Sequence, residues 1–137
     1  MNEFLWPVRV YYEDTDNGGV VYYANYLKFM ERARTEWLRA QGVEQDELSR
    51  SEGVIFAVRL ANMEFKKPAR FNQLLEVSVS IIKRGGASIS FQQQVRDAGD
   101  SKDVLCSAEI KIACLDVQTF RPKAIPDSIN MEKICER

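Results

Sequence analysis

Carboxylates, paired glycines and aromatic rings are concentrated in one short stretch near the amino terminus, residues 11–26. A strand pattern leads into this stretch and a helical pattern leaves it, so we expect Asp16 to lie just before a helix N-terminus. Backbone N–H groups at such a position lack intrahelical acceptors and carry partial positive charge. A carboxylate beside an oxyanion donor suits acyl transfer, so this stretch is the candidate active site.

The chain contains no histidine. This excludes, within the chain itself, a Ser-His-Asp triad, a Cys-His pair, a histidine-ligated metal and imidazole acid–base catalysis. Three cysteines without C-x-x-C spacing argue against a zinc site or a disulfide framework, and we expect them to stay reduced: Cys106, Cys114 and Cys135. Cys106 and Cys114 fall on the apolar phase of a strand pattern and are interpreted as core residues.

Length and charge bound the class of protein. The 137 residues, 45% of them hydrophobic, are close to the commonest size of one domain, so we predict a single domain over residues 1–137. Lys and Arg total 19 against 20 for Asp and Glu, which offers no bulk attraction to nucleic acid or an anionic membrane. The chain shows no signal peptide and no apolar run near the roughly 18 residues of a membrane span. We therefore expect a cytoplasmic protein.

Hydrophobic periodicity predicts an α+β fold. We expect a first strand at residues 7–13 and one long helix at 22–41, ended by Gly42 and followed by a weak helical turn at 45–49. The period then changes from 3.6 to 2, which predicts strands from residue 54 to about 117 with turns at 85–86 and 97–100. The apolar face of the helix would lie against this curved sheet: Tyr26, Met30, Ala33 and Trp37.

Two motifs carry a resemblance to a known family: YEDTDNGGVVY at residues 12–22 and ERARTE at 31–36. With the order of elements, they resemble the hotdog-fold acyl-CoA thioesterases, in particular the Tol-Pal-associated (YbgC-like) branch, which is related to 4-hydroxybenzoyl-CoA thioesterase. The resemblance implies a hotdog fold, in which a curved antiparallel sheet of about five strands wraps one long helix. It also implies hydrolysis of an acyl-CoA to carboxylic acid and free CoA without any cofactor or metal.

The resemblance assigns roles to residues in the first motif and directly after it. Asp16 matches the catalytic aspartate, acting as nucleophile or general base, and Tyr23 matches the position whose backbone N–H binds the thioester carbonyl oxygen. Gly18 and Gly19 match small residues of the tight turn, and Val20 beside them is a candidate substrate contact. Many members of the Tol-Pal branch carry histidine in place of Tyr23, whereas the 4-hydroxybenzoyl-CoA enzymes resemble this chain in carrying tyrosine.

Coenzyme A also requires cations for its phosphates. Lys83 and Arg84 correspond to a basic run that contacts the nucleotide end in the family, although ordinary solvated charge explains them equally well. Four other cations are weaker candidates, for which solvated charge is the favoured interpretation: Arg59, Lys66, Lys67 and Arg70. Val58, with Val54 and Phe56, could line the acyl pocket or simply pack in the core.

Structural alternatives exist for Asp16. An aspartate before a helix is most often an N-cap. A calcium loop counted from Asp14 fails, because its fifth position is Gly18 and its twelfth is Asn25 instead of glutamate. We therefore predict no metal site.

Hotdog proteins usually join their sheets edge to edge, so the resemblance implies a homodimer or homotetramer with an active site shared between protomers. Acyl carrier protein is a further possible partner. Two rival classes remain: a non-hydrolytic module of the same fold that binds acyl-CoA or acyl carrier protein, and a scaffold for envelope or lipid-synthesis partners.

Overall fold

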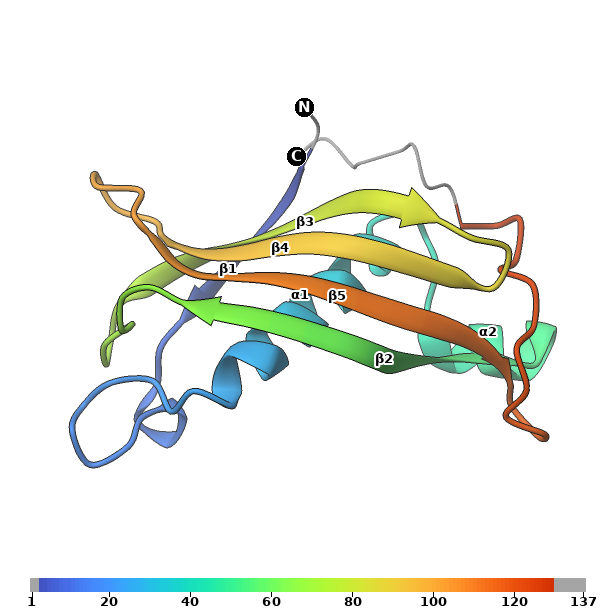
Figure 1. The fold of residues 1–137 in the computed structure, drawn as a ribbon, viewed down its shortest axis with the longest axis horizontal. Coiled ribbons are helices and arrows are strands. Elements are labelled where there is room, and N and C mark those ends of the chain that lie inside the picture. Colours follow the sequence, from blue (N-terminus) through green and yellow to red (C-terminus); the bar gives the residue numbers. More distant parts are fainter. Residues whose placement is uncertain (1–2, 130–137) are drawn as a thin grey trace.

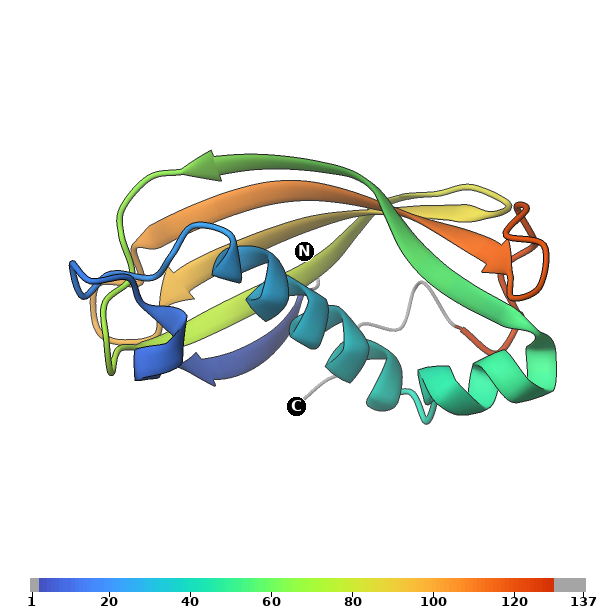
Figure 2. The ribbon, with the colours of Figure 1, turned by 90° about the horizontal axis from the view of Figure 1, so that it is seen from below.

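The computed structural model describes residues 3–129 as one antiparallel sheet with a long helix across one face (Figures 1 and 2). The sheet order is β1-β3-β4-β5-β2, so β1 and β2 form its edges. This confirms the predicted α+β hotdog fold with five strands. The strands are β1 (Phe4–Arg9), β2 (Val54–Phe65), β3 (Leu74–Arg84), β4 (Ser88–Asp97) and β5 (Val104–Asp116), and the helices are η1 (Tyr12–Asp14, a 3₁₀ turn), α1 (Asn25–Arg39) and α2 (Gln45–Glu52).

Helix α1 forms because its apolar residues recur at helical spacing and bury one stripe. The predicted face is confirmed, since all four of its members are buried: Tyr26, Met30, Ala33 and Trp37. The helix packs against β1, β3 and β4, and Figure 2 shows it lying away from the β2 edge. After α1, Gly42 adopts φ +83° and the Val43 N–H donates to the Leu38 carbonyl, as expected for a C-terminal glycine.

The sheet follows the alternation predicted beyond residue 53. Strand β2 pairs antiparallel with β5, and β4 lies between β3 and β5. Inward-facing residues of the central strands form the core with α1, among them Val77, Val79, Ile89, Phe91, Val95, Ile110 and Cys114. The β3–β4 turn at residues 85–87 and the β4–β5 turn at 98–103 lie at opposite ends of the sheet (Figure 1).

Two boundaries in the amino-terminal part of the chain differ from the prediction. The first strand ends at Arg9 and does not reach residue 13, because the Asp14 carboxylate accepts the Tyr11 N–H at 2.8 Å and stabilises the 3₁₀ turn instead. Helix α1 begins at Asn25 and not at residue 22, because the Tyr22 N–H donates to the Asp14 carbonyl at 2.9 Å. The weak turn predicted at 45–49 is extended into α2.

Candidate active site

The loop between η1 and α1, residues 15–24, carries most of the predicted site residues at one end of the molecule (Figure 1). It doubles back on itself: the Asp16 N–H donates to the Val20 carbonyl at 2.9 Å, and the Gly19 N–H donates to the Asp16 carbonyl at 3.1 Å. The loop also lies along residues 69–71, since the Phe71 N–H donates to the Gly19 carbonyl at 3.1 Å. Backbone hydrogen bonds therefore hold the loop on both sides.

Asp16 lies on the exposed side of this turn. Its Oδ1 accepts the Gly18 N–H at 2.8 Å, which leaves Oδ2 available to a ligand or to water. A Cβ at Gly18 would lie 3.3 Å from the same Oδ1, and Gly19 adopts φ +79°, a left-handed conformation that favours glycine. The conformation of Gly19 favours glycine in this turn, and the substrate-binding role of the two glycines stays a prediction.

The position of Asp16 relative to the helix differs from the sequence expectation. It precedes Asn25, the first residue of α1, by nine positions, and the residue at the N-cap position is Ala24. Asp16 is therefore neither adjacent in sequence to the helix N-terminus nor its N-cap, because the turn at residues 16–20 intervenes. The Asp16 carboxylate is exposed, whereas Val20 is half-buried and Val21 is buried.

Tyr23 lies where the loop enters α1. Within residues 3–129, the backbone N–H groups of Tyr23 and Ala24 have no acceptor. In contrast, the Tyr22 N–H donates to the Asp14 carbonyl and the Asn25 N–H donates to the Tyr22 carbonyl. Two adjacent donors at the positive end of a 15-residue helix are thus left for a ligand. The Tyr23 ring is exposed and lies edge-on to Phe65.

A cleft of about 250 Å³ opens beside Tyr23. Its walls come from the loop, from α1 and from the end of β2: Val21, Tyr23, Tyr26, Phe65, Lys66, Lys67 and Pro68. Lys67 pairs with Asp103 at 2.9 Å, and Lys66 lies 3.9 Å from Glu64. These two lysines ranked below Lys83 and Arg84 in the sequence analysis, which had no signal that β2 ends next to Tyr23.

Arg70, another predicted cation, pairs with Val20 of the loop, whereas Lys83, Arg84 and Arg59 lie elsewhere. Lys83 and Arg84 end β3 beside the β3–β4 turn, at the opposite end of the sheet from the loop (Figure 1). Arg59 occupies an irregularity of β2, where the pairing with β5 shifts between Val58 and Leu60. A single copy of the chain therefore does not bring these three cations to Asp16 and Tyr23.

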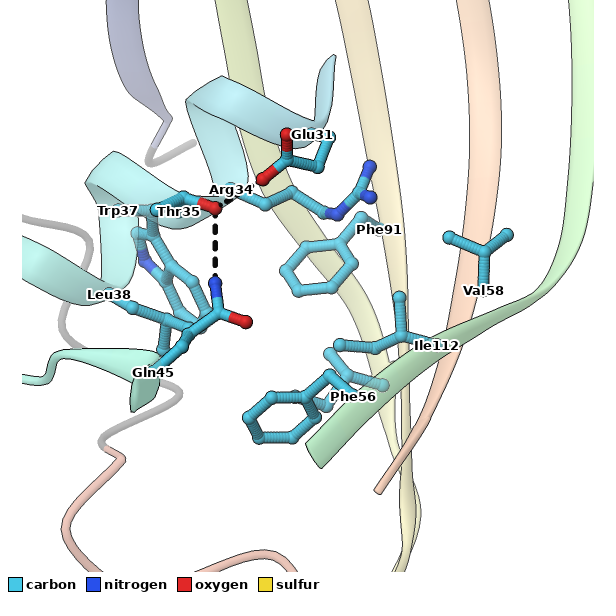
Figure 3. Close-up of a pocket in the computed structure, with 11 residues that line it drawn as sticks. Glu31, Arg34, Thr35, Trp37, Leu38, Gln45, Phe56, Val58, Phe91 and Ile112 are labelled. Atoms are coloured by element: carbon cyan, nitrogen blue, oxygen red, sulfur yellow. Dashed lines mark hydrogen bonds between the residues drawn. The ribbon is translucent and has the colours of Figure 1, made fainter. Parts of the chain in front are cut away.

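A second cavity, of about 120 Å³, lies between α1 and the inner face of β2, β4 and β5 (Figure 3). Figure 3 shows Phe56, Phe91 and Ile112 on the sheet side and a polar rim from Glu31, Arg34, Thr35 and Gln45. Val58 also lines this cavity and is 52% exposed, so it is not packed in the core as the alternative interpretation held.

The two described cysteines are not activated as nucleophiles. Cys106 and Cys114 are free thiols in the core, and burial raises the pKa of Cys106 to about 12 and that of Cys114 in the same direction. Cys135 lies outside the described residues. No cluster of metal-ligating side chains occurs in residues 3–129, and neither α1 nor α2 has the length and apolar character needed to cross a membrane.

Sequence comparison defines the family. Residues 10–132 match the thioesterase-like superfamily. The chain is 45% identical to the acyl-CoA thioester hydrolase YbgC of Escherichia coli O6:H1, with 94% of each chain covered. It is 40% identical to the acyl-CoA thioesterase YbgC of Haemophilus influenzae, with 93% of this chain and 92% of the relative covered.

Solved structures agree with this assignment. A probable thioesterase from Bartonella henselae superposes with a TM-score of 0.85 at 33% identity, covering 91% of this chain and all of that one. The chain belongs to the thioesterase-like superfamily. The predicted YbgC-like hotdog family and the prediction of a thioesterase enzyme are thereby confirmed.

Proposed function

We propose that the chain hydrolyses acyl-CoA thioesters, with Asp16 as nucleophile or general base and the Tyr23 backbone N–H as oxyanion donor. The observation that carries this proposal is the unpaired Tyr23 N–H at the start of α1, in the loop that also carries Asp16. The kinship with YbgC enzymes named for this activity supports the substrate class.

In the proposed reaction, the thioester carbonyl oxygen accepts a hydrogen bond from Tyr23 N–H, which stabilises the negative charge of the tetrahedral intermediate. Asp16 either attacks the carbonyl carbon and expels the CoA thiolate, or takes a proton from a water that attacks instead. In the first route water then hydrolyses the acyl-aspartyl anhydride. Both routes end in a carboxylic acid and free CoA, and neither needs a cofactor or metal.

Release of free thiol from a panel of acyl-CoAs tests the proposal. Asp16→Asn is the informative variant, because its amide oxygen can still accept the Gly18 N–H and preserve the turn while the charge is lost. We expect kcat/KM to fall by about 10² to 10⁴. Asp100→Asn, an exposed aspartate in the β4–β5 turn, is the matched control.

Activity of Asp16→Asn within a few-fold of the wild type would reject the assignment of Asp16. A wild type that binds acyl-CoA without releasing thiol would favour the alternative, a non-hydrolytic module that binds acyl-CoA or acyl carrier protein. The same panel would give the acyl preference.

The proposed assembly is a homodimer, or a homotetramer built from it, joined through β2. Strand β2 is an edge, with backbone groups on one side that no neighbouring strand pairs. Its inner face is also apolar and uncovered: Val58 and Phe65, whose partners on β5 are buried, are each about half exposed. A second copy pairing antiparallel along β2 would cover both the edge and this face.

This assembly would also complete the site. An antiparallel two-fold axis near the middle of β2 places the Phe65 end of one strand beside the Val54 end of the other. The cleft at Tyr23 of one copy then faces the cavity at Phe56 and Val58 of the second copy. The same reversal brings Lys83 and Arg84 of the second copy to the end of the molecule that carries Asp16. We propose that Lys83 and Arg84, with Arg59 on β2, bind the CoA phosphates in this way.

Size-exclusion chromatography with light scattering tests the assembly. Leu60→Glu introduces charge on the edge strand, and Ile82→Glu makes the same change at an equally exposed position on β3, an interior strand. We expect Leu60→Glu to shift the mass toward the 15.7 kDa monomer and Ile82→Glu to leave it unchanged. A monomeric wild type at micromolar concentration would contradict a shared site.

We also propose that the enzyme is located in the cytoplasm and that acyl carrier protein is a further partner.

A further inference from the structure

Asn25, the first residue of α1, has a buried amide side chain. Its Nδ2 donates to the backbone carbonyl oxygen of Asp14 at 2.8 Å, across eleven positions of the sequence. The same carbonyl oxygen accepts the Tyr22 N–H at 2.9 Å. One backbone oxygen thus receives two hydrogen bonds from the segment that leads into the helix.

This pair of hydrogen bonds closes the loop at its base. Asp14 stands two positions before Asp16, and Asn25 stands two positions after Tyr23. The Asn25 N–H also donates to the Tyr22 carbonyl at 2.8 Å, which orients the peptide groups on either side of Tyr23. The part of the loop with the Asp16 carboxylate and the part with the Tyr23 N–H are joined at the base by the Asn25 amide. The separation of these two groups therefore depends on that amide.

Helix formation does not account for an asparagine at this position. Asparagine is a poor helix former, and the side chain of Asn25 bonds to a residue outside the helix instead of to the first-turn N–H groups. A buried amide is also costly unless its hydrogen bonds are made. Its hydrogen bond joins the loop to the helix, and nothing else in the described chain accepts from Nδ2.

We propose that Asn25 is a positioning residue, which sets the separation between the Asp16 carboxylate and the Tyr23 N–H through the Asp14 carbonyl. This inference rests on the proposed function of the same loop. Asn25 does not touch the reacting atoms in this account, so its removal acts on the geometry of the transition state and not on the affinity for CoA.

Steady-state kinetics of Asn25→Ala, with Lys28→Ala as control, provides the first test. Lys28 lies one turn further along α1 and is exposed. We expect Asn25→Ala to lower kcat on the order of 10²-fold, as for a misplaced catalytic group, while KM stays near the wild-type value. Lys28→Ala should match the wild type in both constants. A kcat of Asn25→Ala equal to that of the wild type, with only a lowered Tm, would overturn the proposal.

Asn25→Asp adds a pH signature. An ionised carboxylate cannot donate to the Asp14 carbonyl, whereas a protonated one can. The ratio of the Asn25→Asp kcat to the wild-type kcat should therefore rise as the pH falls, while the corresponding ratio for Asn25→Ala stays flat. A flat ratio for both variants would contradict a role that depends on the donated hydrogen bond.

Amide hydrogen exchange separates this inference from the proposed function, because it needs no turnover. Peptides covering residues 14–24 should exchange faster in Asn25→Ala than in the wild type or in Lys28→Ala. Unchanged exchange would show that Asn25 does not hold the loop closed, and it would overturn the proposal even in an active enzyme. Faster exchange in a chain that releases no thiol would support the closing of the loop by Asn25, but it would reject hydrolysis and, with it, the positioning of Asp16 and Tyr23 for that reaction.

Discussion

The hydroxyl of Tyr26 accepts a hydrogen bond from the backbone N–H of Ala69 at 3.0 Å, and both residues are buried. The Ala69 carbonyl in turn accepts the Val21 N–H at 2.8 Å. A single residue of the β2–β3 connection therefore joins α1 to the loop that carries Asp16. Burial raises the pKa of the Tyr26 phenol, and the hydrogen bond from Ala69 opposes this shift. Tyr26 is thus a structural residue and not an acid or base.

Tyr26→Phe should destabilise the protein by about 1–3 kcal/mol, because it leaves the buried Ala69 N–H without an acceptor. Urea denaturation measures the change in the free energy of unfolding. Tyr22→Phe removes an exposed hydroxyl from a neighbouring tyrosine and should stay within about 0.5 kcal/mol of the wild type. Equal stabilities of the two variants would show that the Ala69 N–H finds another partner.

Gly19→Ala should destabilise the protein by about 1–2 kcal/mol, since Gly19 adopts φ +79° and a Cβ is disfavoured there. No atom lies within 4 Å of the added Cβ, so the effect is one of backbone conformation alone. Gly19→Asn should cost less, because asparagine tolerates the left-handed region better. Gly86→Ala, at a turn glycine with ordinary φ and open space, is the control and should be close to neutral.

Gln93 and Arg34 should show coupled effects on stability. Gln93 is fully buried; its Oε1 accepts from Arg34 Nη1 at 2.9 Å, and its Nε2 donates to the Met30 and Ser78 carbonyls at 3.1 and 3.2 Å. Burial lowers the pKa of the Arg34 guanidinium, and the charge of Glu31 opposes this shift. Gln93→Leu should therefore cost about 1–3 kcal/mol.

The double variant Arg34→Met with Gln93→Leu should cost less than the sum of the single changes, because no guanidinium is then left unpaired. Urea denaturation of the four proteins in this cycle gives the coupling free energy. If the destabilisations of the two single variants simply added, the Arg34 guanidinium in Gln93→Leu would be hydrogen-bonded equally well by water.

Stability should fall in alkaline solution through Cys106. Burial raises the pKa of this thiol from 9.0 to about 12, so between these values the folded chain keeps a proton that the unfolded chain has lost. The contribution is complete below about pH 9 and is lost as the pH rises toward 12. Between pH 8 and pH 10.5, Cys106→Ala should therefore lose less stability than the wild type. Parallel losses in the two proteins would locate the alkaline sensitivity in other groups.

Local patterns predicted much of the fold. Strand β2 begins at Val54 and the β3–β4 turn lies at Gly85-Gly86, both as predicted, because period-2 alternation and turn residues depend on a few sequence neighbours. The helix face of Tyr26, Met30, Ala33 and Trp37 was equally visible in the spacing. The sequence also concentrated the candidate site into one stretch, which forms the single loop at residues 15–24.

Other features depend on residues far apart in the chain. The start of α1 is set by the Asp14 carbonyl, and the place of Lys66 and Lys67 beside Tyr23 is set by the pairing of β2 with β5. Gln93 shares the buried phase of β4 with Phe91 and Val95, and its hydrogen bonds to α1, not its residue type, make that burial possible. These features follow from tertiary contacts that no local pattern encodes.

By itself, the sequence determined which chemistry is excluded: without histidine the chain has no imidazole catalysis, and residues 11–26 concentrate carboxylates ahead of a helix. Only the tertiary structure decided that Asp16 is exposed in a turn, that the Tyr23 N–H is unpaired, and that Asn25 closes the loop between them. The physical reason is that residue type and periodicity act locally, whereas the separation of two groups on a loop is set by hydrogen bonds across its base.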